Sequence, residues 1–116
     1  MSVSLRKNLP WIQILNNADP KVCKKILKTV PNEVILCLCE IINNYLHGNI
    51  PYSKKDLQKL KKYKGCLRCL ASKTNDKRKN GIAKKRQLLI QNGGFLPAIL
   101  TPLLSIAGGL LSSIIP

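Results

Sequence analysis

The cysteines are the residues whose types and spacing come nearest to a metal-binding or redox set. Cys66 and Cys69 form a Cys-x-x-Cys pair, and Cys37 and Cys39 lie upstream of them. A zinc site needs two such pairs on converging turns, but both pairs fall within predicted helices. The spacing of Cys37 and Cys39 also points their side chains to nearly opposite faces, and a thioredoxin-like use would need a βαβ context. We therefore expect reduced thiols that pack as small hydrophobic groups, with no metal or other cofactor.

The sequence offers no candidate catalytic residues. The lone histidine, His47, precedes Gly48 at a predicted helix end, where a histidine caps carbonyl groups. There is no Ser/His/Asp set, no carboxylate pair and no glycine-rich phosphate loop. We expect a protein that is not an enzyme and has no small-molecule substrate.

Charge is distributed very unevenly along the 116 residues. The chain has 20 Lys and Arg against 5 Asp and Glu, for a formal net charge of +15. Residues 54–86 hold 14 of the basic and 2 of the acidic residues, and so carry +12 of this charge, whereas residues 87–116 have no charged side chain. The chain is nevertheless 45% hydrophobic, which excludes a fully disordered basic protein and favours one small domain.

Helix signals fill the first part of the chain. Asp19-Pro20 is a start signal, because an N-cap acceptor precedes a proline at the first helical position. Pro31 ends this helix, and Asn32 is expected to cap the next one, which Gly48 closes.

Two further helices are predicted around these. Ser53 is expected to cap one continuous helix with Leu57, Leu60, Leu67 and Leu70 on one side. A short helix is expected around residues 9–15, limited by Pro10. The predicted fold is all-α: a small helical bundle over residues 1–72, a flexible basic linker over 73–94 and a hydrophobic C-terminal helix in 95–116.

The basic segment favours binding to the phosphate backbone of nucleic acid, a mode that is sensitive to salt and insensitive to sequence. Alternatives are a solvated helix face with a nuclear-import signal, and attraction to anionic lipid headgroups. The candidate phosphate contacts are Lys73, Lys77, Arg78, Lys79, Lys84, Lys85 and Arg86, assisted by lysines of residues 54–70.

The charge-free C-terminal segment has a stripe of small residues. Thr101, Ser105, Gly109 and Ser113 recur every four residues, which in lipid favours close helix packing. A helix over residues 97–115 would be about 28 Å long, near the thickness of a hydrocarbon core. The alternative is that this helix packs onto the N-terminal bundle, and hydropathy does not separate the two at this length.

The C-terminal region resembles that of the adenovirus precursor core protein X (mu) family. The resemblance covers about the last 40 residues, a basic stretch followed by Gly-Gly-x-Leu-Pro and then an apolar tail. The matching residues are Gly93, Gly94, Phe95, Leu96 and Pro97, then Ile99, Leu100, Pro102, Leu103, Leu104 and Ala107 to Gly109. Small basic proteins of Polinton or adintovirus-like elements are also similar, including over the N-terminal helical half.

This resemblance implies a virion core protein that binds and neutralises double-stranded DNA. It also implies proteolytic processing after Gly93-Gly94, although Gln91 stands where the family's protease prefers Met, Ile or Leu. The tail over residues 95–116 would contact capsid protein or membrane, and the protein would lie in the virion or host nucleus. A membrane-active or membrane-anchored small viral protein is the alternative.

Overall fold

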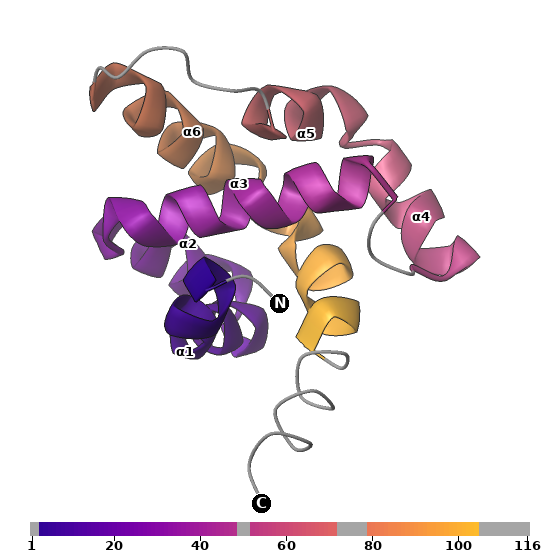
Figure 1. Cartoon of the computed structure of the whole chain (residues 1–116), viewed down its shortest axis with the longest axis horizontal. Coiled ribbons are helices and arrows are strands. Elements are labelled where there is room, and N and C mark those ends of the chain that lie inside the picture. Colours follow the sequence, from indigo (N-terminus) through magenta and orange to yellow (C-terminus); the bar gives the residue numbers. More distant parts are fainter. Residues whose placement is uncertain (1–2, 49–51, 72–78, 105–116) are drawn as a thin grey trace, which may run out of the picture.

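The protein is an all-helical bundle arranged around one central helix. The computed structural model describes residues 3–48, 52–71 and 79–104, and all regular elements within these ranges are helical, as predicted (Figure 1). The elements are α1 (Val3–Asn17), α2 (Pro20–Thr29), α3 (Asn32–Leu46), α4 (Lys54–Lys61), α5 (Lys64–Ala71), α6 (Lys79–Asn92) and the 3₁₀ turn η1 (Gly93–Phe95). Residues 96–104 continue as a further helical segment.

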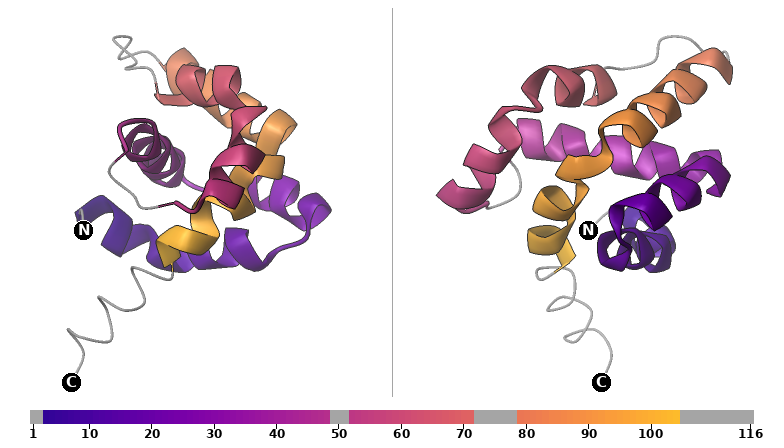
Figure 2. Two further views of the ribbon diagram at one scale, coloured as in Figure 1. Left: turned by 90° about the vertical axis from the view of Figure 1, so that its right-hand side faces the viewer. Right: turned by 180° about the vertical axis from the view of Figure 1, so that it is seen from behind.

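Helix α3 occupies the centre because its sequence is apolar around most of its circumference. Figure 1 and Figure 2 show α3 crossing the molecule with α5 and α6 on one side and α1 and α2 on the other. It packs against α1, α5 and α6. Its buried side chains are Val34, Ile35, Cys37, Leu38, Cys39, Ile41 and Ile42. A helix with so wide an apolar surface is stable only when other helices cover it on several sides.

The helix boundaries follow several of the predicted capping signals. Asp19 caps α2 by accepting a hydrogen bond from the Val22 backbone N–H at 3.0 Å, and Pro20 is the first residue of that helix. Ser53 caps α4 in the same way, accepting from the Asp56 N–H at 3.2 Å. Gly48 follows α3 with a φ of 71°, the left-handed conformation that glycine adopts most easily.

Three boundaries differ from the prediction. Asn32 is the first residue of α3 and not its side-chain cap. The helix expected over residues 53–70 is interrupted at Lys62–Tyr63, which separates α4 from α5 and leaves Leu57 exposed. Helix α1 begins earlier than expected and contains Pro10 in its interior, because its apolar residues, buried against the bundle, offset the lost hydrogen bond.

The segment expected to be a flexible basic linker, residues 73–94, is helical over most of the part that the structure describes. Residues 79–92 form helix α6, which packs against α2, α3 and α5. Ile82, Lys85, Arg86 and Leu89 share one face of this helix at spacings of three, four and seven residues, and Leu89 is fully buried. Packing of this face against the neighbouring helices, and not a separation of polar from apolar residues, accounts for the helical conformation of the segment. Residues 72–78 lie outside the described part of the chain.

The beginning of the predicted tail belongs to the hydrophobic core. Five of its side chains are buried, namely Phe95, Leu96, Ile99, Leu100 and Leu103. The Phe95 ring lies 5.5 Å from the Tyr63 ring, and the Tyr52 hydroxyl donates a hydrogen bond to the Ile99 carbonyl at 2.9 Å. Residues 95–104 therefore complete the bundle, and among the described residues no helix is long and apolar enough to cross a membrane.

Truncating the chain before Phe95 should abolish the cooperative unfolding of the bundle. Each large apolar side chain removed from the core costs about 1.5–3 kcal/mol, and five of them match the whole stability of a typical domain. Thermal unfolding followed by far-UV circular dichroism compares residues 1–94 with residues 1–104. The longer fragment should unfold cooperatively and the shorter one should not. Equal midpoints in the two would show that residues 95–104 are not part of the core.

Candidate nucleic-acid interface

The predicted phosphate contacts occupy very different environments. Lys84 is exposed on α6, but Lys85 is buried with 7% of its surface accessible. Arg86 crosses to α2, where its guanidinium donates to the Leu27 carbonyl at 2.7 Å and to the Asn32 side-chain oxygen at 2.8 Å. The Leu27 carbonyl lies in the last turn of α2, where carbonyl groups lack helical partners. Arg86 thus joins α6 to the end of α2 and the start of α3.

The other predicted site residues are described only in part. Lys73, Lys77 and Arg78 lie outside the described residues, and Lys79 begins α6 with a side chain that is not described. Thr101 is exposed and donates a hydrogen bond to the Asn16 side-chain oxygen at 3.0 Å. Ser105, Gly109 and Ser113 are outside the described part of the chain.

A lysine face that the sequence analysis did not single out lies on α2. Its four lysines, Lys21, Lys24, Lys25 and Lys28, are all exposed, while Cys23, Leu27 and Val30 on the other side are buried. Spacings of three, four and seven residues place the four ammonium groups on one face of the helix. The same spacing in the sequence predicts this α2 lysine face. A count of charges along the chain overlooks it, because residues 54–86 hold most of the basic residues.

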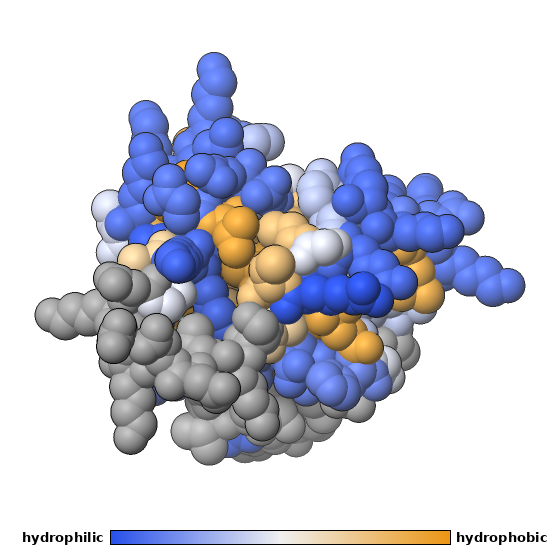
Figure 3. Space-filling model, turned by 90° about the horizontal axis from the view of Figure 1, so that it is seen from above, coloured by the Kyte–Doolittle hydropathy of each residue, from blue (hydrophilic) through white to orange (hydrophobic). Residues whose placement is uncertain are grey.

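A second row of lysines lies on α4. Lys55 and Lys59, together with Lys62 directly after the helix, are exposed and are spaced by four and three residues, so they follow one side of α4. The Lys62 Nζ lies 5.3 Å from the centre of the Tyr63 ring, within the range of a cation–π contact. Seen from above, hydrophilic side chains project from the right-hand end of the molecule, where Figure 1 places α4, and apolar atoms are exposed nearer the middle (Figure 3).

Two open clefts meet at Tyr63 and connect these lysine rows. The first has a volume of about 420 Å³ and lies between α2 and the α4–α5 junction, with Lys24 among its lining residues. The second, of about 470 Å³, has Lys59, Lys62 and the acidic Asp56 among its lining residues. Tyr63, Gly94 and Pro97 line both. Lys24 on one side and Lys59 and Lys62 on the other therefore line neighbouring clefts that meet at Tyr63.

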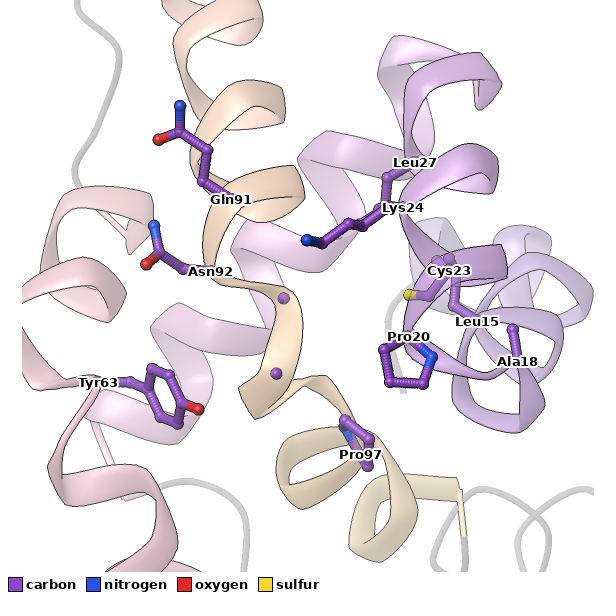
Figure 4. A pocket seen from close by; sticks show the side chains of 12 residues that line it. Leu15, Ala18, Pro20, Cys23, Lys24, Leu27, Tyr63, Gln91, Asn92 and Pro97 are labelled. Carbon is purple, nitrogen blue, oxygen red and sulfur yellow. The ribbon is translucent and has the colours of Figure 1, made fainter.

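The first cleft combines a cationic edge with polar and apolar walls. Figure 4 shows the Lys24 amine and the Tyr63 hydroxyl both directed into it from opposite sides, and Gly93 and Gly94 also line it. Leu15, Ala18, Pro20, Leu27 and Pro97 supply the apolar lining. None of the residues that line this cleft is acidic.

Gly93 and Gly94, the expected processing site, form part of the 3₁₀ turn η1. The residue after them, Phe95, is 1% exposed. A β-carbon at Gly94 would lie 3.0 Å from the Tyr63 hydroxyl oxygen, so glycine allows the turn to approach that ring closely. Gly94 itself is exposed, but the Gly94–Phe95 bond lies within a 3₁₀ turn, and a protease would reach it in extended form only after local unfolding.

The cysteines are free thiols, most of them removed from solvent, and the histidine lies at a helix end. All five cysteines are free thiols; Cys23, Cys37 and Cys39 are buried, and Cys69 is exposed. Burial raises the pKa of Cys39 to about 11, although the nearby charge of Lys85 lowers it in part. The His47 ring Nδ1 lies 2.8 Å from the Asn43 carbonyl oxygen, which confirms the predicted cap at the end of α3.

No family model, curated protein or solved structure is similar to this chain.

Replacing Arg86 with Gln should destabilise the fold by about 1–3 kcal/mol, because two acceptors on α2 and α3 lose a charged donor. Lys84→Gln, two residues away on the exposed side of α6, is the matched control and should change the stability by less than about 0.5 kcal/mol. Urea denaturation measures both. If the two variants unfold alike, the contacts of Arg86 contribute nothing to the stability.

Raising the pH should weaken the fold through Cys39. Its pKa in the folded state, about 11, lies above the ordinary thiol value of 9.0. The native state therefore favours the protonated thiol, and this contribution is complete below pH 9 and is lost as the pH rises toward 11. The difference in unfolding free energy between the natural chain and Cys39→Ala should shrink by about 2 kcal/mol over that range. A pH-independent difference would contradict this.

Proposed function

We propose that the protein binds double-stranded DNA without sequence specificity and neutralises its phosphates, as a core or accessory protein of a virus or virus-like element. The observation that carries the binding proposal is the pairing of two exposed lysine rows across the surface around Tyr63. The viral setting, in the virion or host nucleus, rests on the sequence resemblance alone. The proposed role is neutralisation of charge and not catalysis.

The α2 lysine face supplies the first part of this interface. Four lysines within about two turns give a high density of ammonium groups, and each can approach a phosphate without disturbing the core. Asp19, the acidic residue that directly precedes α2, uses its carboxylate to cap the helix. A surface with this charge attracts a polyanion and releases counterions when it binds.

The α4 lysines extend the interface beyond Tyr63. Asp56, the acidic residue of α4, accepts a hydrogen bond from the Ser53 hydroxyl at 2.9 Å, so its carboxylate is directed to the start of the helix. Lys84 and the lysines and arginine of residues 73–79 remain proposed additional contacts. Lys85 and Arg86 are better suited to holding α6 in place, because one is buried and the other is hydrogen-bonded to α2 and α3.

No hydrogen-bonding pattern on these helices favours one base over another. Lysines act as point charges and lack the paired donors with which arginine recognises guanine. The proposed interface therefore recognises the backbone, and the contact with capsid protein or membrane proposed for residues 95–116 concerns chiefly the part outside the described residues.

Affinity for duplex DNA should fall steeply with salt and depend on α2. For the double variant Lys25→Gln/Lys28→Gln, the slope of log affinity against log salt should become shallower by about 2, since each phosphate contact contributes about 0.9. Fluorescence anisotropy with duplexes of two unrelated sequences measures this slope.

The control variant Arg6→Gln/Lys7→Gln removes the same charge from α1, where Lys7 is paired with Glu33 at 3.3 Å. It should leave the slope nearly unchanged. Equal effects of the two double variants would mean that only the net charge matters. An affinity that does not respond to salt would exclude binding through phosphates altogether.

A further inference from the structure

We infer that the cleft between α2 and Tyr63 binds one unpaired nucleotide, with the phosphate at Lys24 and the base in the apolar interior. This inference rests on the proposed binding of nucleic acid and extends it to a small, shaped site. Sequence spacing could not reveal this cleft, and the expectation from the sequence is of no small-molecule substrate, because the residues that build it come from distant parts of the chain. Its walls combine α1, α2, the α4–α5 junction, the end of α6 and η1.

The lysine at the edge of the cleft favours a ligand with a negative charge. Lys24 directs its amine into the space, and no acidic side chain lines it. Its neighbours Lys21 and Lys28 on the same face of α2 raise the local positive potential without lining the cleft. One ammonium group at the edge of a recess is suited to one phosphate group.

The size and lining of the cleft select an aromatic heterocycle as the rest of the ligand. A volume of about 420 Å³ lies within the range of small-molecule sites, roughly 300–1,000 Å³. Apolar side chains from α1 and α2 line the cleft, and Pro97 lines it as well. The Tyr63 hydroxyl faces them, so the ligand needs both an apolar surface and a hydrogen-bonding edge. A nucleobase has both.

The position of the cleft explains how a strand would reach it. Lysines of α2 stand on one side and those of α4 on the other, with Tyr63 between them. A strand whose phosphates contact these lysines can place one base into the recess between them. A base inside a duplex cannot enter, because it is paired and stacked. The site therefore favours an unpaired nucleotide in a single strand, at a strand end or free in solution.

Titration of the full-length, isotope-labelled protein with dTMP, followed by amide chemical shifts, tests the inference. Shifts should be largest at Lys24, Tyr63 and Gly94, and smaller with thymidine or inorganic phosphate, each of which supplies half of the ligand. Lys24→Gln should weaken dTMP binding by about 10-fold or more. The matched control Lys25→Gln, on the same helix but outside the cleft, should weaken it less than about 2-fold.

The Tyr63 hydroxyl is tested in the same way. Tyr63→Phe should weaken dTMP binding severalfold, and Tyr45→Phe, a tyrosine that does not line the cleft, should not. A short single strand of thymidine nucleotides should shift the same amides more strongly than a blunt duplex of equal length. If free dTMP binds but the strand does not shift these amides, the source is the free nucleotide and the site stands.

The inference and the proposed function fail in different ways. Salt-dependent binding to duplex DNA, combined with dTMP shifts that are absent or spread over all lysines, would overturn the nucleotide site and leave the proposed function intact. Equal effects of Lys24→Gln and Lys25→Gln on dTMP binding would overturn the site as well. Localised dTMP binding without any affinity for duplex DNA would instead overturn the proposed function.

Discussion

The packing of residues 95–104 into the bundle is the interaction on which the rest of the structure depends. The Phe95 ring packs beside the Tyr63 ring, and the Ile99 carbonyl accepts a hydrogen bond from the Tyr52 hydroxyl. Because this segment is fixed at both points, the glycine turn before it lies directly under Tyr63. The two clefts, and the common border of the α2 and α4 lysines, exist only in that arrangement. The most apolar part of the chain thus positions the most cationic surfaces.

The net charge of +15 sets the second constraint. Lysines three or four residues apart on an exposed helix repel one another by about 0.2–0.5 kcal/mol for each pair. The bundle compensates by burying its apolar residues tightly around α3. A bound polyanion would remove this repulsion, and so would stabilise the folded chain as well as occupy its surface. The same charge therefore weakens the isolated protein and would strengthen the proposed complex with a polyanion.

How much of the fold the sequence predicts depends on whether the signal is local. Asp19-Pro20, Ser53 and Gly48 act on backbone groups within a few residues, and each defines the helix end predicted for it. Asn32 does not, because its side-chain oxygen accepts from Arg86, which lies far away in the sequence. The break at Lys62–Tyr63 is likewise not local, since Tyr63 turns toward Phe95. Neither long-range contact can be inferred from spacing alone.

The candidate site is harder to predict from the sequence than the helix ends. The number of basic residues in a segment does not show which of their side chains point to solvent and which point to the core. Lys85 and Arg86 belong to the densest basic segment, yet they share a helix face with Ile82 and Leu89, and that face is turned to the core. On α2 the lysines avoid the apolar face, so all of them remain in solvent. The helical register therefore decides which cations can meet a phosphate, and it moves the centre of the proposed interface from α6 to α2. The cleft follows from this shift, because Lys24 is the α2 lysine that faces Tyr63 across it.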